Sequence, residues 1–421
     1  MKFLLGFLLA LSLAFGGEFS IKDMRGAEVK IASPLERVAT IDDGFVESVM
    51  AHLGVIDKVK LIGSWSMKRD YKYDFTTKAG EAYTLRGWNV MKYLHPWLND
   101  LPCVNSPQGN VVNFEALANE NPQLVILRIG DCTLRGSNKD AVEKTIATIE
   151  ALGIPLAVIY APRGAEIATM QEEMRVLGEI FGQKDKALKL FEYLDKTQKL
   201  VQERTANLKD DQKVSMLYMG LNPNIRKNGG VASAYGVNTP ESFIIENIAG
   251  AKNAFRGDGS NVILSTEQLY AIDPDVIVLP TSNGYHPASE LLSSADFEKL
   301  EELKAIKNKR VYAMPWSPMN CARRVEYPID ILIIAKAAYP QLFLDIKVHK
   351  FVIDFDRDVC SRDPSFCHFC IDKRFGIGMF DGDTHHQCSA TPVLSHFTCG
   401  IRIPLHKRYE SGGGQRRVFY G

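Results

Sequence analysis

The chain has 421 residues, its 50 Lys plus Arg balance 50 Asp plus Glu, and apolar residues make up 46% of it. This length exceeds that of a common single domain, and the composition is globular rather than disordered, fibrous or coiled-coil. With zero net charge, the chain lacks the excess of basic residues that a dedicated nucleic-acid binder has. Its eight cysteines are too few for a disulfide scaffold. Five of those cysteines lie between Cys360 and Cys399, which indicates that the last stretch differs from the rest.

The first residues predict a secretory signal peptide over residues 1–16. A cationic Lys2 precedes the apolar run Phe3–Phe15, and the small residue Gly16 follows. As a helix this run rises only about 20 Å, which is too short to span a membrane. The alternative is a buried N-terminal helix. No cysteine lies near the cleavage point and no later segment has eighteen uncharged apolar residues, so we expect a soluble periplasmic protein without a lipid anchor.

Residues 17–183 alternate between short apolar runs and helical patterns. Runs without polar alternation are typical of strands buried on both faces of a parallel sheet. The alternation of strand and helix therefore predicts an α/β lobe. The expected strands are Val38–Ile41, Lys60–Gly63, Leu124–Leu127 and Leu156–Tyr160, and the expected helices include Phe45–Leu53 and Lys139–Leu152.

The same pattern resumes over residues 211–355 and predicts a second α/β lobe. The expected strands are Val214–Tyr218, Val276–Leu279 and Arg310–Ala313. The expected helices are Glu241–Ile248, Phe297–Ile306 and the buried Pro328–Ala338.

A helix–Pro–strand sequence pattern that occurs twice, here called the internal echo, supports two similar lobes. Phe114–Leu117 leads to Pro122 and a buried strand, and Thr266–Leu269 leads to Pro274 and another. In both copies a Glu precedes the Pro by seven residues. One such match is common in α/β proteins, but one copy in each half fits a repeated unit better.

A linking helix is expected over residues 184–210. The segment Lys184–Leu208 has no Gly or Pro and is rich in strong helix formers. As a helix it spans about 37 Å, enough to cross from one lobe to the other. The alternative is a surface helix of one large domain.

Local enzyme motifs are absent from the sequence. It contains no P-loop, no His-Glu-x-x-His and no Gly-x-Ser-x-Gly. The pair Asp42–Asp43 is a weak signal, because adjacent carboxylates in a loop are usually solvated turn residues.

Three stretches resemble a known family: Arg37–Gly63, Val112–Arg128, and Ser242–Asn253 followed by Ser265–Pro280. With the signal peptide and the central helix, they make residues 18–355 similar to the periplasmic solute-binding proteins of iron-complex and cobalamin ABC importers, the rigid-helix class. The resemblance implies two Rossmann-like α/β lobes joined by one long spanning helix, with a ligand cleft between the lobes. It also implies no cofactor, no catalysis and a monomer that delivers its ligand to an inner-membrane ABC permease.

Ligands of open α/β sheets bind in the loops beyond the carboxyl ends of the strands. Aromatic rings there can stack on a flat chelate, and Arg can pair with its carboxylate or catecholate oxygens. The alternatives are an Arg that is a solvated surface charge and a Trp that packs against a lobe. The candidate ligand-binding residues are Asp43, Trp65, Trp88, Tyr93, His95, Arg128, Tyr218, Tyr235, Trp316, Arg323 and Arg324.

A metal site is not predicted for the two lobes. Direct binding of a metal needs three or four convergent ligands. His52 lies in an amphipathic helix and is expected to be structural, whereas His95 and His286 could meet across the cleft. Cys103 and Cys132 could form a disulfide in an oxidising periplasm.

The stretch 356–421 is an atypical tail with five cysteines and five of the nine histidines. It has no sustained helical or strand period, and the regular pattern stops after Phe355. We expect a disordered extension. A metal knuckle around Cys367–Cys370, a disulfide-bonded addition and a segment translated out of frame remain open.

Together these features predict the substrate-binding component of an ABC importer. Its expected ligand is a metal chelate such as iron–siderophore, cobalamin or a haem-like molecule. The alternatives are a binding protein for a free metal or an oxyanion such as molybdate, and an exported chelatase-like enzyme.

Overall fold

The computed structural model describes residues 17–64, 67–68, 70–88, 90–104, 112–130, 134, 138–162, 167–281, 285–314 and 324–360. All of these belong to one compact unit, Met1–Asp383. Within the described part, no helix has the length and apolar character that crossing a membrane requires. The predicted signal segment 1–16 and the residues after Cys360 lie outside the description.

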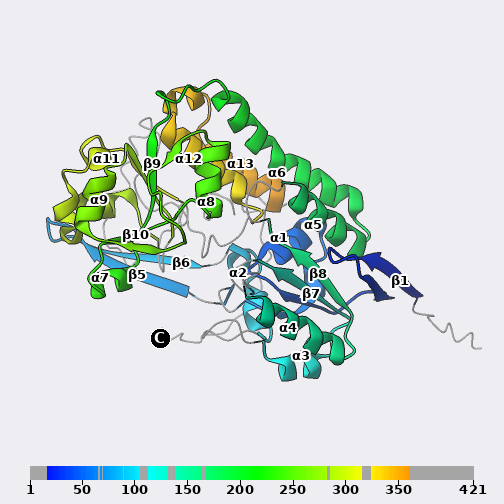
Figure 1. Ribbon diagram of the computed structural model, residues 1–421. Coiled ribbons are helices and arrows are strands. Elements are labelled where there is room, and N and C mark those ends of the chain that lie inside the picture. The colour runs from blue at the N-terminus through cyan, green and yellow to red at the C-terminus, as the bar shows by residue number, and fades with distance from the viewer. Residues whose placement is uncertain are drawn as a thin grey trace, which may run out of the picture. The chain divides into compact units, whose positions relative to one another are not determined.

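A four-stranded parallel sheet forms the first lobe (Figure 1). Side chains of successive residues pack on opposite faces: Val38 contributes to a core with α1 and α5, and Ala39 to a core with α3 and α4. Both faces are covered, which explains the unbroken apolar runs. The strand order is β4 (Val59–Ile62), β3 (Val38–Ile41), β7 (Leu124–Ile129) and β8 (Leu156–Tyr160), and the helices are α1 (Phe45–Leu53), α3 (Phe114–Glu120), α4 (Lys139–Ala151) and α5 (Ile167–Ile180).

Several smaller parts accompany this sheet. The hairpin of β1 (Gly17–Lys22) and β2 (Glu28–Ser33) adds Ile21, Val29 and Ile31 to the core beside α5. The other parts precede α3 in the chain: η1 (Ile56–Lys58), the hairpin of β5 (Asp70–Thr76) and β6 (Ala82–Trp88), α2 (Val90–Leu94) and η3 (Pro96–Asp100).

A six-stranded mixed sheet forms the second lobe. Its order is β12 (Val262–Leu264), β10 (Ala232–Ala234), β9 (Ser215–Gly220), β13 (Val276–Leu279) and β14 (Val311–Ala313), with β11 (Lys252–Asn253) beside β9. Strand β10 is antiparallel to both of its neighbours, whereas β11, β13 and β14 are parallel to the strands they pair with. The helices are α7 (Pro223–Lys227), α8 (Pro240–Phe243), η4 (Ile244–Ile248), α9 (Thr266–Ile272), α10 (Ala288–Ser293), η5 (Ala295–Leu300), α11 (Lys304–Lys307), α12 (Tyr327–Ala338), η6 (Pro340–Phe343) and α13 (Val348–Cys360).

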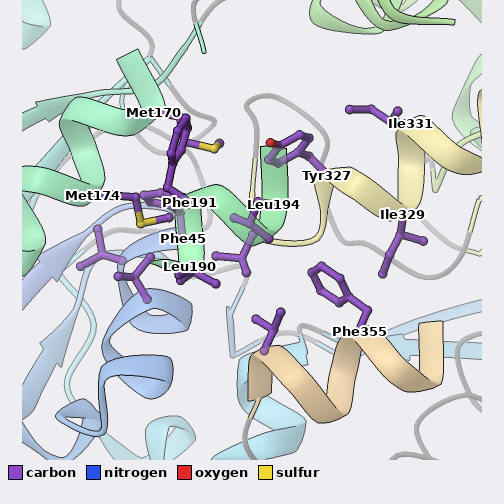
Figure 2. Packing of buried hydrophobic residues seen from close by; sticks show 14 of the residues in the cluster. Phe45, Met170, Met174, Leu190, Phe191, Leu194, Tyr327, Ile329, Ile331 and Phe355 are labelled. Carbon is purple, nitrogen blue, oxygen red and sulfur yellow. The ribbon is translucent and has the colours of Figure 1, made fainter. Parts of the chain in front are cut away.

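One long helix, α6 (Lys184–Thr205), contacts both lobes. It packs against α5 of the first lobe and α12 of the second. Figure 2 shows Phe191 of α6 close to Met170 and Met174, with Leu194 on the side toward Tyr327. All of these residues belong to a single hydrophobic core, which therefore continues from one lobe to the other.

Helix α13 supplies a second connection. It packs against α1 and α12, and Phe355 contributes to the shared core (Figure 2). The expected loss of regular pattern after Phe355 is wrong, because the helix continues to Cys360 and Val359 is buried. His52 Nδ1 donates a hydrogen bond to the Val359 carbonyl at 2.8 Å, so His52 has a structural contact.

The internal echo corresponds to a repeated structural unit. In the first lobe α3 leads to β7, and in the second α9 leads to β13. Asn113 and Ser265 cap the start of these helices, and both helices end at a residue with positive φ, Asn121 at 43° and Asp273 at 34°.

Two predicted helices are interrupted. Glu241–Ile248 divides into α8 and the π-helical turn η4, and Phe297–Ile306 divides into η5 and α11. In the second case Leu303 adopts an extended backbone and is fully buried. Burial of this leucine in the lobe overrides the strong helix propensity of the surrounding residues.

Candidate ligand-binding site

The loop after β3 carries two buried aspartates into the start of α1. Asp42 Oδ2 accepts hydrogen bonds from the backbone N–H groups of Gly44 at 3.2 Å and Val46 at 2.8 Å. A carboxylate at this position compensates the unsatisfied donors and the positive dipole end of the helix. Gly44 permits the sharp turn, because its φ of 110° is unfavourable for residues with a side chain.

Asp42 forms a buried acid pair with Glu47 of α1. Burial raises the pKa of Asp42, and burial together with the charge of Asp42 raises the pKa of Glu47 well above its usual range. The Thr40 hydroxyl donates to Glu47 Oε1. Within the described part of the chain, Asp42 Oδ1 and Glu47 Oε2 are buried without a hydrogen-bond partner.

Arg128, near the carboxyl end of β7, lies beside this pair. Its Nε donates to Glu173 Oε1 at 2.6 Å and its Nη2 to Oε2 at 3.2 Å. The guanidinium carbon is 3.9 Å from the centroid of the Phe45 ring, and Nη1 is 3.9 Å from Asp43 Oδ1. Burial raises the pKa of Glu173 to about 7, although Arg128 favours its ionised form. Arg128 and Glu173 are both fully buried, so they form an interior ion pair.

Asp43 connects the two lobes. Arg324, which precedes α12 of the second lobe, donates from Nη2 to Asp43 Oδ2 at 3.0 Å. Both side chains are buried. Within the described part of the chain, Asp43 Oδ1 is buried without a hydrogen-bond partner. Two predicted site residues, separated by most of the sequence, therefore meet where the lobes come together.

A second group of predicted residues lies around the carboxyl end of β9. The rings of Tyr218 and Tyr235 pack edge to face with centroids 5.2 Å apart. The Tyr235 hydroxyl donates to Asn261 Oδ1 at 3.1 Å, and burial raises the pKa of Tyr235. Burial also raises the pKa of Glu241, in α8, to about 7.

The remaining predicted site residues divide into two groups. His95 is buried at the start of η3, with its ring centroid 6.3 Å from that of Trp97. Trp88 lies in β6 and Tyr93 in α2, but their side chains are outside the description, as are the whole of Trp65, Trp316 and Arg323.

The predicted meeting of His95 and His286 receives no support from the contacts of either ring. His286 Nδ1 is 2.8 Å from Glu290 Oε2 and its ring is 4.6 Å from that of Tyr73, whereas His95 lies beside Trp97. Among the described residues, no three His, Cys, Asp or Glu side chains are placed to hold one metal ion. The pairing of Cys103 with Cys132 falls outside the described residues, because Cys132 is not among them.

Sequence reasoning missed the β5–β6 hairpin and its contacts with the second lobe. The signal was present: Tyr73 and Phe75 alternate with exposed polar residues, as do Tyr83 and Leu85 on the returning strand. Such alternation, with a Gly-containing turn between, is the pattern of a half-buried hairpin.

The chain belongs to a family of binding proteins. The sequence model of the family described as "Periplasmic binding protein" matches residues 86–318, more than half of the chain. The family is one of solute-binding proteins. A comparison with the curated proteins finds no match.

Solved structures share the fold. A periplasmic solute-binding protein from Veillonella parvula has a TM-score of 0.65 and 22% identity, over 86% of this chain and 98% of that one. The molybdate periplasmic binding protein MolA of Haemophilus influenzae, bound to molybdate, has a TM-score of 0.60 and 18% identity, over 82% and 98%. CeuE of Helicobacter pylori with Ni(II) bound has a TM-score of 0.58 and 21% identity, over 83% and 99%.

Proposed function

We propose that this protein is the soluble periplasmic component of an ABC importer, and that it captures a metal chelate with anionic groups for an inner-membrane permease. The family match and the two-lobed fold support the carrier role. The observation that carries the ligand class is the Asp43–Arg324 ion pair, because it places an arginine at the meeting point of the lobes.

The chemistry of this ion pair suits an anionic ligand. An arginine presents a planar fork of donors that matches carboxylate or catecholate oxygens. Asp43 holds Arg324 in position and compensates its charge while no ligand is present. A carboxylate of the ligand can then take the place of the Asp43 carboxylate on Arg324, so that the buried guanidinium stays paired.

The fold alone does not choose among ligands, since the similar structures include a molybdate-bound and a nickel-bound protein. We therefore propose a direct measurement: native mass spectrometry of the protein purified from its source, with metal analysis. A bound chelate supports the proposal. Molybdate as the bound species would instead favour the oxyanion carrier.

Replacing Arg324 by glutamine is expected to weaken chelate binding by about tenfold to a hundredfold, because a hydrogen bond to a charged group contributes about 1.5–3 kcal/mol. The measurement is fluorescence titration with haemin, a ferric catecholate, cyanocobalamin, nickel–histidine and molybdate. R256Q is the matched control, because Arg256 forms an exposed ion pair with Glu246. Equal affinities of R324Q and R256Q for the bound chelate would contradict the role of Arg324.

The same titrations separate a carrier from an enzyme. A carrier binds one equivalent and releases the chelate unchanged on unfolding. Recovery of a metal-free or altered chelate after incubation would favour the exported chelatase.

We also propose that residues 1–16 are removed during export. The mass of the protein recovered from the periplasm is expected to correspond to a chain beginning near Gly17, without added lipid mass. Retention of Met1–Gly16 in that fraction would contradict the signal peptide.

A further inference from the structure

The β5–β6 hairpin belongs to the first half of the sequence but packs on the second lobe. In Figure 1 the two light-blue arrows of β5 and β6 extend toward the green and yellow elements of that lobe. Thr77 pairs with Ser294 in an isolated antiparallel bridge, and Lys78 N–H donates to the Ser293 carbonyl at 2.8 Å. The end of α10 therefore holds the hairpin tip. This helix belongs to the second lobe, whereas the residues before and after the hairpin in the sequence belong to the first.

One face of the hairpin is covered and the other is exposed. Tyr73 lies opposite Leu85, and Phe75 lies opposite Tyr83, with the rings of Phe75 and Tyr83 stacked at 5.1 Å. Tyr73, Phe75 and Thr77 are buried, whereas Lys72, Asp74 and Thr76 between them are exposed. A two-stranded hairpin is marginally stable alone, so its order depends on the surface that covers this face.

Tyr73 makes the most specific contact between the hairpin and the second lobe. Its hydroxyl donates to Glu290 Oε1 of α10 and accepts from Arg226 Nη2 of α7 at 3.2 Å. Its ring packs against His286, which is itself bonded to Glu290. A buried hydroxyl between two charged partners is costly to separate from them, because each partner then loses a hydrogen bond.

The hairpin passes the carboxyl end of β14 in the second sheet. Leu85 packs against Tyr285, in the segment after β13, and against Ala313, the last residue of β14. Ala313 marks the carboxyl end of β14, which pairs in parallel with β13. Ligands of open α/β sheets occupy this edge.

We propose that the β5–β6 hairpin is a strap over the ligand site, latched to α10 by Tyr73, and that it must detach for ligand to enter or leave; this inference rests on the proposed carrier function. Because Tyr73, Phe75 and Leu85 lie outside the shared core, the strap can open locally while α6 and that core keep the lobes fixed. The strap thereby limits the size of the ligand that the site accepts.

Hydrogen exchange tests the latch without any ligand. In Y73F the amide of Lys78, which bonds across to Ser293, is expected to exchange about tenfold faster, together with the rest of residues 72–85. Amides of β9 and β13 should not change. Y83F is the matched control, because the Tyr83 hydroxyl bonds Glu81 within the hairpin itself.

Thiol labelling tests whether the strap controls access. A313C places a thiol beneath Leu85, and its reaction with N-ethylmaleimide is followed by mass spectrometry of that peptide. The reaction is expected to be about tenfold faster in Y73F/A313C than in A313C or Y83F/A313C. Unchanged labelling, or faster exchange throughout β9 and β13, would overturn the strap. Neither measurement uses a ligand, so its failure is distinct from a failure of the titrations that test the carrier function.

Discussion

Replacing Glu173 by glutamine is expected to lower the free energy of unfolding by about 3–5 kcal/mol at pH 8. Arg128 is fully buried and its guanidinium donates two hydrogen bonds to this carboxylate. An arginine cannot release its proton in a protein, so the variant leaves a buried positive charge that has lost the carboxylate accepting its two hydrogen bonds, while Asp43 stays 3.9 Å away. Urea denaturation followed by circular dichroism measures the change.

The neighbouring residue provides a matched control. Glu172 also pairs with an arginine, Arg175, but its side chain is 43% exposed. Exposed ion pairs contribute about 0–1 kcal/mol, so E172Q should stay within that range. If E173Q were no more destabilising than E172Q, the buried pair would not support the interior of the first lobe as described.

Removing Arg128 instead should cost less, and the cost should fall at low pH. Burial already raises the pKa of Glu173 to about 7, so this acid can become neutral when its partner is lost. R128M is therefore expected to be less destabilising at pH 6 than at pH 8. The comparison of the two variants distinguishes an ion pair from a simple loss of packing, which would not depend on pH.

Replacing Glu241 by glutamine is expected to raise the free energy of unfolding relative to that of the natural chain as pH rises from 5 to 8, by about 2.5 kcal/mol in total. Burial raises the pKa of Glu241 from 4.5 to about 7, so the folded state holds a proton that the unfolded state releases. The natural chain keeps this stability below the unfolded pKa and loses it as pH rises through the folded pKa. Glutamine does not titrate, so the free energy of unfolding of the variant does not fall with pH for this reason.

Urea denaturation of both chains at pH 5, 6, 7 and 8 measures this difference. E267Q is the control, because a hydrogen bond from Ser265 lowers the pKa of Glu267 and keeps it ionised throughout the range. The E267Q difference should therefore stay constant with pH. A constant difference for E241Q as well would mean that Glu241 is ionised in the folded protein.

Much of the fold could be predicted because its strands are covered on both faces. Val38–Ile41 and Val276–Leu279 are unbroken apolar runs, and the structure has strands with these bounds. The interrupted helices could not be predicted, because the burial of Leu303 depends on neighbours distant in sequence. The β5–β6 hairpin was missed for a different reason. Its alternating pattern is present in the sequence, but the sequence does not show that α10 provides the surface against which the hairpin packs.

The site was predictable as a set of loops but not as a set of contacts. Asp43 and Arg324 were both expected near the ligand, and the structure brings them together in an ion pair. Arg128 was chosen by the same rule, yet it is fully buried against Glu173. A loop rule identifies the edge of the sheet, whereas the direction of each side chain is decided by packing partners such as Phe45. The contact of each residue with ligand stays a prediction.

The shared core around α6 also bears on how such a protein can diversify. Leu190 and Phe191 pack with residues of the first lobe, while Ile329 and Ile331 of the second belong to the same cluster (Figure 2). A lobe exchanged between relatives would have to match this apolar surface as well as its own interior, because mismatched volumes in a close-packed core are destabilising. New ligand preferences are thus expected to accumulate in loops and in the hairpin, where a substitution leaves the common core intact.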